Sequence, residues 1–257
     1  MTKVLITGSA DGLGLMAARL LIDGGHAVTL HARDEARASE ALSAAPGAAG
    51  VLTGDLASIR QTRALADHAN AAGPFDAVIH NAGVGYREPL RVETEDGLAH
   101  VFQINVLAPY LLTALIAAPT RLVYLSSGLH RSGDPALEDL QWRRRDWNGM
   151  QAYSDSKLFD VVLAFAVARR RPATLSNALE PGWVATKMGG PGAPDDLDQG
   201  AETQVWLAVS DDPDAAVSGR YFYHRRLREA HPAASDAEVQ DELLHACEHI
   251  TGTALTA

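Results

Sequence analysis

The chain alternates short apolar runs with longer segments of helical periodicity, and this alternation constrains its fold more than any other feature. Six runs are rich in β-branched or apolar residues, and the segments between them carry apolar residues three and four positions apart. Such a pattern favours parallel strands in one sheet, with crossover helices on both faces. The sequence therefore predicts an α/β fold built on a doubly wound parallel sheet.

The expected elements can be placed by residue number. Strands are expected at 4–7, 27–30, 51–52, 77–80, 121–126 and 174–179, and helices at 13–22, 34–44, 58–71, 94–117 and 152–169. Ser235 and Glu238 resemble a capping box that opens a last helix at about 236–251, which Gly252 would end. Residues 1–257 are expected to form a single domain, with loops at about 129–150 and 187–200.

Composition narrows the classes of partner. A formal net charge of -10 argues against binding to nucleic acid or to an anionic membrane. The first residues lack the basic leader and long apolar core of a signal peptide, and Cys247 is the one cysteine. These features are typical of a cytoplasmic protein. The three arginines at 143–145 are expected to form a solvated face, with a grip on an acidic substrate as the alternative.

A glycine-rich turn follows the first predicted strand and opens the first predicted helix. Residues 7–14 read T-G-S-A-D-G-L-G. Glycines let the backbone turn tightly and approach a pyrophosphate, and the helix N-terminus offers free N–H groups and the positive end of its dipole. The turn is therefore predicted to bind a dinucleotide. The residues expected to contact it are Gly8, Ser9, Asp11, Gly12, Leu13 and Gly14.

Tyr153 and Lys157 are four residues apart on a predicted helix, so they share one face. An ammonium close to a phenol stabilises the phenolate and lowers the pKa of the phenol from about 10. The tyrosine can then exchange a proton with a substrate oxygen near neutral pH. The pair is predicted to supply the acid and base of an enzyme.

Seven motifs occur in order along the chain, and together they resemble those of the short-chain dehydrogenases/reductases. They are the T-G-x-x-x-G-x-G turn, Asp55-Leu56, Asn81-Ala82-Gly83, Asn105, Ser126-Ser127, the Y-x-x-x-K at 153–157 and the P-G-x-V-x-T at 181–186. The similarity is closest to the single-domain retinol dehydrogenase and carbonyl reductase group. It implies a Rossmann-type fold and an oxidoreductase that moves a hydride between a nicotinamide cofactor and a carbonyl–alcohol pair.

The resemblance also implies roles for individual residues. Tyr153 would transfer the proton, Lys157 would bind the nicotinamide ribose, and Asn105 would link the lysine to solvent through water. Ser127 is the expected partner of the carbonyl oxygen, with Ser126 as the alternative. The remaining residues expected to line the cofactor are Asp55, Leu56, Asn81, Ala82, Gly83, Pro181, Gly182, Val184 and Thr186.

Three positions depart from the family pattern. Tyr124 stands where asparagine is usual, Gly128 follows the serine pair at once, and Glu180 stands where the related group often has histidine. The first two departures bear on the choice of serine, and the sequence offers no explanation for the third.

The residues after the second predicted strand should select the cofactor. Relatives that prefer NAD usually carry Asp where Ala32 stands, and Arg33 can bind the 2′-phosphate of NADP. His31 is expected to line the same site. The sequence predicts NADP(H) as the preferred cofactor. NAD(H) is the alternative if Arg33 is only a solvated arginine or if Asp34 turns toward the ribose.

Aromatic residues in the expected loops bear on the substrate. Trp142, Trp147 and Met150 would either form an apolar wall for a ketone or aldehyde or pack their own loop down. Trp183 and Met188 are expected on a lid over the substrate. The predicted function is reduction of an apolar carbonyl by NADPH. The alternatives are an NAD-dependent alcohol dehydrogenase and a non-catalytic dinucleotide sensor, and the presence of the tyrosine–lysine pair disfavours the sensor.

The sequence also bears on the remaining partners. The substrate is predicted to be a small molecule. Relatives pair through the helices expected at 94–117 and 152–169, which predicts a homodimer or homotetramer, or a monomer if the segment 129–150 covers that face. His245 and His249 lie four apart, but no further ligand is evident, so no metal is predicted.

Overall fold

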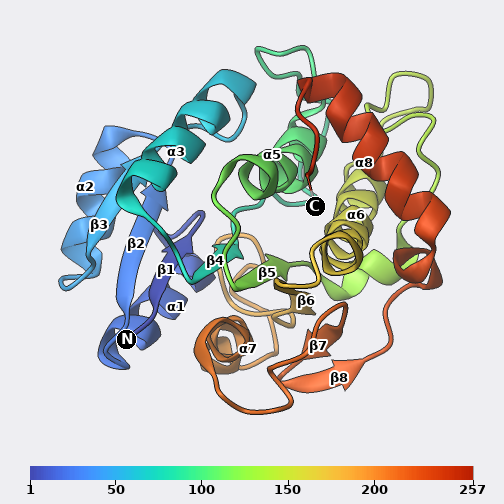
Figure 1. The fold of residues 1–257 in the computed structure, drawn as a ribbon. Helices are drawn as coiled ribbons and strands as arrows, with labels where there is room; N and C mark the ends of the chain where they lie inside the picture. Colours follow the sequence, from blue (N-terminus) through green and yellow to red (C-terminus); the bar gives the residue numbers. More distant parts are fainter. Residues whose placement is uncertain (257) are drawn as a thin grey trace.

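The computed structural model describes residues 1–256, and its strands form one sheet with helices on both faces (Figure 1). The strands are β1 (Lys3–Ile6), β2 (Ala27–Ala32), β3 (Gly50–Thr53), β4 (Ala77–His80), β5 (Arg121–Leu125), β6 (Leu175–Glu180), β7 (Tyr221–Tyr223) and β8 (Arg226–Arg228). They lie in the order β3-β2-β1-β4-β5-β6-β7-β8. All neighbours pair in parallel except β7 and β8. The doubly wound Rossmann-type sheet is confirmed.

Helices cover both faces of this sheet. They are α1 (Gly12–Asp23), α2 (Glu35–Ala44), α3 (Ile59–Ala72), α4 (His100–Phe102), α5 (Ala108–Leu115), α6 (Gly149–Arg170), α7 (Leu197–Val209) and α8 (Ala237–Thr251), with short turns η1 (Gln103–Leu107), η2 (Gly128–Ser132) and η3 (Pro232–Ser235). In Figure 1, α3, α5 and α6 lie above the sheet and α1 and α7 below it. Helix α8 packs against α6 on the outside.

Each face of the sheet buries its own apolar core, and the strand alternation divides the residues between them. In β1, Leu5 belongs to the core under α3, α5 and α6, while Val4 and Ile6 belong to the core under α1, α2 and α7. All three side chains are fully buried. Parallel strands covered on both faces read as continuous apolar runs, which is why the sequence located them.

The helix expected at 94–117 begins later and is interrupted. The Thr94 N–H donates to Leu98 O at 2.9 Å, and Glu93 pairs with Ala99 as an isolated bridge, so this stretch is a tight turn. The helical path starts at His100 and passes through the π-turn η1 before α5. A tight turn with strand-like backbone pairing over 93–99 therefore replaces the first turns of the expected helix.

Four later elements differ from expectation. Strands β7 and β8 have three residues each, too few for a periodic pattern. Helix α7 begins within the expected loop 187–200, and the Asp196 side chain caps it. The last helix is capped by Asp236, which accepts from the Glu238 N–H at 2.9 Å, and not by Ser235. Gly252 ends that helix in the left-handed conformation, as expected.

Within the described part of the chain, no helix is both long and apolar enough to cross a membrane. Residues 1–256 also contain no group of three or more His, Cys, Asp or Glu side chains that could hold a metal ion. His245 and His249 are exposed on α8.

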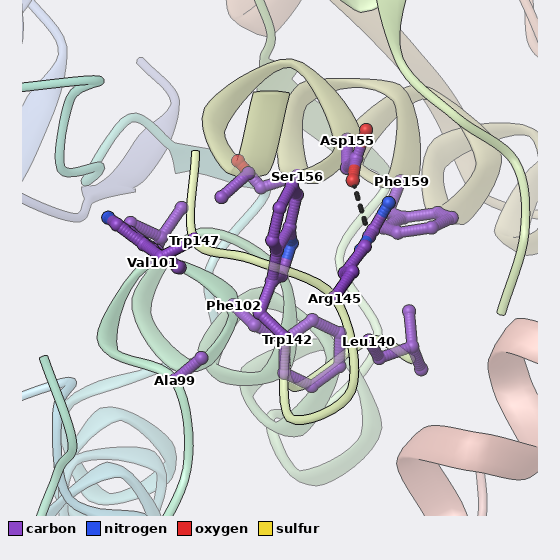
Figure 2. A pocket seen from close by; sticks show the side chains of 11 residues that line it. Ala99, Val101, Phe102, Leu140, Trp142, Arg145, Trp147, Asp155, Ser156 and Phe159 are labelled. Atoms are coloured by element: carbon purple, nitrogen blue, oxygen red, sulfur yellow. Dashed lines mark hydrogen bonds and ion pairs between the residues drawn. The ribbon is translucent and has the colours of Figure 1, made fainter. Parts of the chain in front are cut away.

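Trp142 and Trp147 of the segment 129–150 pack this segment onto α6 (Figure 2). The Trp142 and Trp147 rings meet edge to face at 5.5 Å, and the Arg145 guanidinium lies 3.7 Å from the centre of the Trp142 ring. Arg145 also forms an ion pair with Asp155 of α6 at 2.8 Å. The space left between these residues measures about 10 Å³, room for about one water molecule. Of the two interpretations of these aromatics, packing holds.

This packing also explains the arginine run. The backbone N–H groups of Arg143, Arg144 and Arg145 all donate to the Asp139 carboxylate. Arg145 is half-buried against Asp155, whereas the other two are exposed. Only part of the run is therefore a solvated face.

Helix α6, one of the two expected pairing surfaces, is covered by the chain itself. The turns η2 and η3 and helix α8 pack against it, and the segment around Trp142 covers another part. Ala164 and Ala166 are fully buried in the core. A helix buried on all sides has no apolar stripe left to offer a partner.

Substitution of Asp155 tests this packing. Asp155→Ala should lower the free energy of unfolding by about 3 kcal/mol, because Arg145 loses its shortest ion pair and the Asp134 N–H and Gln151 side chain lose their buried acceptor. Denaturant unfolding measures the change. Asp146→Ala, at an exposed carboxylate of the same segment, should change the value by less than about 0.5 kcal/mol. Equal effects from the two variants would show that the ion pair does not hold the segment.

Candidate active site

The carboxyl ends of four adjacent strands bring the predicted site together. Strands β1, β4, β5 and β6 are neighbours in the sheet, and their ends lead into Thr7, Asn81, Ser126 and Pro181. In open parallel sheets this edge is where ligands bind. Motifs separated by up to 180 positions in the sequence thus meet at one edge.

The glycine turn is shaped by close backbone contacts. Gly8 has φ +62° and Gly12 has φ +54°, in the left-handed region that disfavours other residues. A side chain at Gly14 would place its Cβ 2.5 Å from Gly8 O and against the Asn81 amide. The turn therefore requires glycine for both its conformation and its packing.

Asn81 holds this turn against β4. Its side-chain amide donates to Thr7 O and Gly8 O, both at 3.0 Å. The Thr7 hydroxyl in return accepts the N–H groups of Asn81 and Ala82 at 3.0 and 3.1 Å. The Asn-Ala-Gly motif thus supports the phosphate-binding turn from the neighbouring strand.

Ser9 and His31 lie behind the turn, and their side chains bind the chain itself. The His31 Nδ1 accepts the Gly8 N–H at 2.9 Å, so Nε2 carries the proton and donates to Gly54 O at 2.9 Å. The Ser9 hydroxyl donates to Ile6 O and accepts the His31 N–H. Burial lowers the pKa of His31, so it braces the turn as a neutral ring. The side chains of Ser9 and His31, both predicted at the cofactor, therefore form their hydrogen bonds within the chain.

The front of the turn remains available for an anion. No side chain caps the first N–H groups of α1, because the carboxylate of the N-cap residue Asp11 does not fold back on them. A Cβ built on Gly12 would meet no atom within 4 Å. Asp11 instead pairs with Arg37 and Lys187, both at 2.6 Å. Free helix N–H groups beside an open backbone fit a pyrophosphate.

Arg33 and Asp34 lie at the end of β2, where the adenosine ribose is expected. The Asp34 carboxylate accepts the Arg37 N–H at 2.8 Å and caps α2. It also pairs with the exposed Arg33 at 3.2 Å. Arg37, which the sequence analysis missed, brings a second guanidinium beside the glycine turn.

Asp55 and Leu56 follow β3, at the same carboxyl edge of the sheet as Arg33 and Asp34. The Asp55 carboxylate accepts the Ala57 N–H at 2.9 Å, while its own N–H donates to the Gln61 side chain at 3.1 Å. Leu56 is buried in the core. The pair forms a well-fixed turn at the edge where adenine is expected.

Lys157 lies one helical turn after Tyr153 on α6, as predicted. Its ammonium is 5.8 Å from the centre of the Tyr153 ring and donates to Leu125 O at 2.8 Å. It also forms a buried ion pair with Asp160 at 2.7 Å. Sequence analysis missed Asp160, because a carboxylate three residues after a lysine is typical of a solvated helix face.

The two candidate serines have different surroundings. The Ser126 hydroxyl is buried and donates to Lys157 O at 2.7 Å. The Ser127 hydroxyl accepts the Leu129 N–H at 3.3 Å, and its proximity to the Tyr153 phenol lowers the pKa of that phenol. Of the two serines, Ser127 lies at the phenol.

Burial raises the pKa of Tyr153, although Lys157 and the Ser127 hydrogen bond act in the opposite direction. The expected lowering by Lys157 is therefore real but smaller than the effect of burial. In the chain alone, Tyr153 is a protonated phenol at neutral pH.

Asn105 lies in the π-turn η1, and both polar atoms of its side chain form hydrogen bonds within the chain. Its Oδ1 accepts the Val84 N–H at 2.8 Å, and its Nδ2 donates to Val84 O and to the Ser156 hydroxyl. A Cβ on Gly83 would lie 3.4 Å from both the Asn105 Oδ1 and the Lys157 Nζ. Gly83 thus lets the asparagine and the lysine approach each other.

The loop after β6 reaches back over Tyr153. Gly182 has φ +86°, and the Asp195 carboxylate accepts the Trp183 N–H at 2.5 Å. The Met188 Sδ lies 3.8 Å from the Tyr153 hydroxyl. The Tyr86 ring meets the Tyr153 ring edge-on at 5.6 Å. Tyr86 and Asp195 were not predicted.

The other motif residues of this loop stabilise its conformation. Val184 is buried and bridges to Asp195, and the Thr186 hydroxyl accepts the Gly189 N–H at 3.2 Å. Glu180, just before Pro181, pairs with Arg131 at 3.3 Å. This charged pair lies beside Gly128, next to the serines.

A phosphate-binding turn at the edge of a Rossmann-type sheet, beside a buried tyrosine, lysine and serine, defines a dinucleotide-dependent oxidoreductase. The family model of short chain dehydrogenases matches residues 2–127. The chain belongs to the short-chain dehydrogenase/reductase family, and it is an NAD(P)-dependent enzyme of hydride transfer.

Similarity extends over the whole chain. The short-chain dehydrogenase chyC of Penicillium rubens is 45% identical over 100% of both chains. Retinol dehydrogenase 14 of Mus musculus is 35% identical over 97% of this chain and 85% of its own. A solved structure from Mycobacterium paratuberculosis superposes with a TM-score of 0.86 at 28% identity, covering 100% of this chain and 96% of its own. The resemblance to retinol dehydrogenases is thereby confirmed.

Gly14→Ala tests the glycine turn. Alanine normally stabilises a helix relative to glycine by about 1 kcal/mol, but here its Cβ would collide with Gly8 O. The variant should bind NADPH at least about tenfold more weakly, as measured by cofactor fluorescence. Gly50→Ala, where a Cβ meets no atom within 4 Å, should bind normally. Unchanged binding in Gly14→Ala would exclude this turn as the cofactor site.

Proposed function

We propose that the protein reduces a ketone or aldehyde with NADPH. The observation that carries the proposal is the buried phenol of Tyr153, which lies beside Ser127 and whose ring centre is 5.8 Å from the Lys157 ammonium; burial raises the pKa of this phenol, so it favours the protonated form. A protonated acid beside a second hydroxyl suits delivery of a proton to a carbonyl oxygen. The family membership supports hydride transfer as the accompanying step.

The residues divide the reaction between them. The bound cofactor supplies the hydride that adds to the carbonyl carbon. Tyr153 gives its proton to the carbonyl oxygen, and Ser127 donates a hydrogen bond to that oxygen as negative charge develops. Ser126 is unsuited to this role, because its hydroxyl already donates to Lys157 O. Lys157 would hold the nicotinamide ribose, and Asn105 would order the adjoining loop through Val84.

We infer an apolar substrate from the surroundings of Tyr153. The thioether of Met188 and the ring of Tyr86 are the apolar groups that contact this phenol. Retinol dehydrogenase 14, a relative at 35% identity, is named for an apolar alcohol. The Arg131–Glu180 pair adds a charged edge near Ser127, so the substrate would also carry a polar group on that side.

We propose NADP(H) as the preferred cofactor. Ala32 provides no carboxylate to repel a 2′-phosphate, and the Asp34 carboxylate is committed to capping α2. Arg33 and Arg37 leave two guanidinium groups near the end of β2, and guanidinium groups bind phosphate strongly. NAD-dependent alcohol oxidation on the same fold is the competing function.

Tyr153→Phe tests the proposed chemistry. The variant should retain NADPH binding and lose carbonyl reduction by at least about 10³-fold, because the proton donor is gone. A screen of apolar ketones and aldehydes with NADPH provides the assay. Tyr110→Phe removes a buried hydroxyl that binds Thr253 O far from the site, and should leave turnover unchanged. Turnover within tenfold of the unmodified enzyme in Tyr153→Phe would refute the mechanism.

Arg33→Ala tests the cofactor assignment. Loss of a charge-assisted contact to the 2′-phosphate should raise the KM for NADPH by about 10- to 100-fold, with little change for NADH. Steady-state kinetics with both cofactors measures the ratio. Arg144→Ala, an exposed arginine of the segment 129–150, serves as the control. Equal increases for the two cofactors, or an unmodified enzyme that prefers NADH, would favour the NAD-dependent alternative.

A further inference from the structure

Two buried carboxylates lie on α6, and the packing of the chain accounts for only one of them. Asp155 binds Arg145, the Asp134 N–H and the Gln151 side chain, and so secures the segment 129–150. Asp160 has a different partner, since its carboxylate meets the Lys157 ammonium at 2.7 Å. Both side chains of this second pair are about 95% buried. A carboxylate therefore contacts the lysine of the proposed catalytic pair.

The ion pair restricts the position of the lysine. An ammonium has three N–H donors, and in Lys157 two of them are used by Leu125 O and Asp160. The lysine backbone is fixed as well, because Lys157 O accepts the Ser126 hydroxyl. One donor remains for a further acceptor such as a ribose hydroxyl.

The ion pair also sets the charge next to Tyr153. Burial alone would lower the pKa of Lys157, but Asp160 and then Tyr153 outweigh it and raise this pKa. Burial raises the pKa of Asp160 to about 6, against the effect of Lys157. At neutral pH the pair is therefore ionised on both sides, and its net charge is zero.

Other titratable and charged groups surround this pair. Tyr124 of β5 and the adjoining His80 of β4 lie on the sheet side, and burial lowers the pKa of His80 to about 3, so that it is neutral. The groups that act on Tyr153, Tyr124 or Tyr221 from the surrounding elements are Tyr86, Lys157, Asp160, Arg171, Glu180 and Arg131. Asp160 is the one carboxylate among them that acts directly on Tyr153.

We propose that Asp160 is a positioning residue of the active site, which holds the Lys157 ammonium in place and offsets its charge so that Tyr153 stays a protonated donor. The inference rests on the proposed reductase function, and it adds a residue that sets the protonation state of Tyr153. Reduction of a carbonyl uses the phenol, whereas oxidation of an alcohol uses the phenolate. An uncompensated ammonium would favour the phenolate, and Asp160 removes that advantage.

Asp160→Asn tests the proposal while keeping the shape of the side chain. Loss of the negative charge favours ionisation of Tyr153, so the alkaline limb of the pH profile for carbonyl reduction should move to lower pH by about one unit. Binding of NADPH should change by less than about threefold, since the glycine turn is untouched. An alkaline limb that stays in place would contradict the proposal.

Two control variants separate charge from packing. Asp160→Glu keeps the charge, so its alkaline limb should remain within about half a unit of that of the unmodified enzyme. Asp155→Asn, at the other buried carboxylate of α6, should lower stability without moving the limb. A merely structural role for Asp160 would reduce kcat at every pH and leave the limb where it was.

A titration without turnover provides an independent measurement. The phenolate absorbance of the cofactor-free enzyme, after subtraction of the Tyr153→Phe spectrum, reports the ionisation of Tyr153 alone. It should have its midpoint above the ordinary value of 10.0, and a midpoint below about pH 8 would overturn the proposal even if Asp160→Asn did not fold. If no carbonyl is reduced, the proposed function fails, but this midpoint still tests the role of Asp160.

Discussion

The geometry of the active site depends on the contacts that bind the middle of α6 to the end of β5. Lys157 takes part with both its backbone and its side chain, because its carbonyl accepts the Ser126 hydroxyl and its ammonium donates to Leu125 O. These contacts set the rotation of α6 about its axis. Tyr153, one turn earlier, is thereby held beside Ser127. Ser126 thus fixes the orientation of α6, and its neighbour Ser127 is the serine that we propose faces the substrate.

Much of this arrangement could be predicted because it depends on short-range patterns. Strands buried on both faces are continuous apolar runs, and a glycine turn between a strand and a helix is visible as a local motif. The Tyr153–Lys157 spacing places both residues on one face of a helix without knowledge of the rest of the fold. Motif order then placed the site at the carboxyl edge, since parallel strands end there.

What escaped prediction depends on contacts between distant residues. His31 was expected at the cofactor, but its two nitrogens bind Gly8 and Gly54, a pairing set by the register of β2 beside β1 and β3. Asp160 was not predicted at all, because the sequence does not show that the middle of α6 is buried. For the aromatic residues near Tyr153 the sequence left open a substrate wall or packing of their own loop, and the contact of Trp142 with Arg145 shows the packing. In each case the direction of the side chain depends on the fold and could not be predicted from the sequence.

The contact between Met188 and Tyr153 has a consequence for substrate affinity. The thioether lies 3.8 Å from the Tyr153 hydroxyl and also packs on Gly85, so the carbonyl substrate that we propose would have to displace it to reach the phenol. The free energy of that displacement makes the binding free energy of every such substrate less favourable. Residues that stabilise the loop from a distance, such as Asp195, would therefore change the affinity for substrate without contacting the substrate.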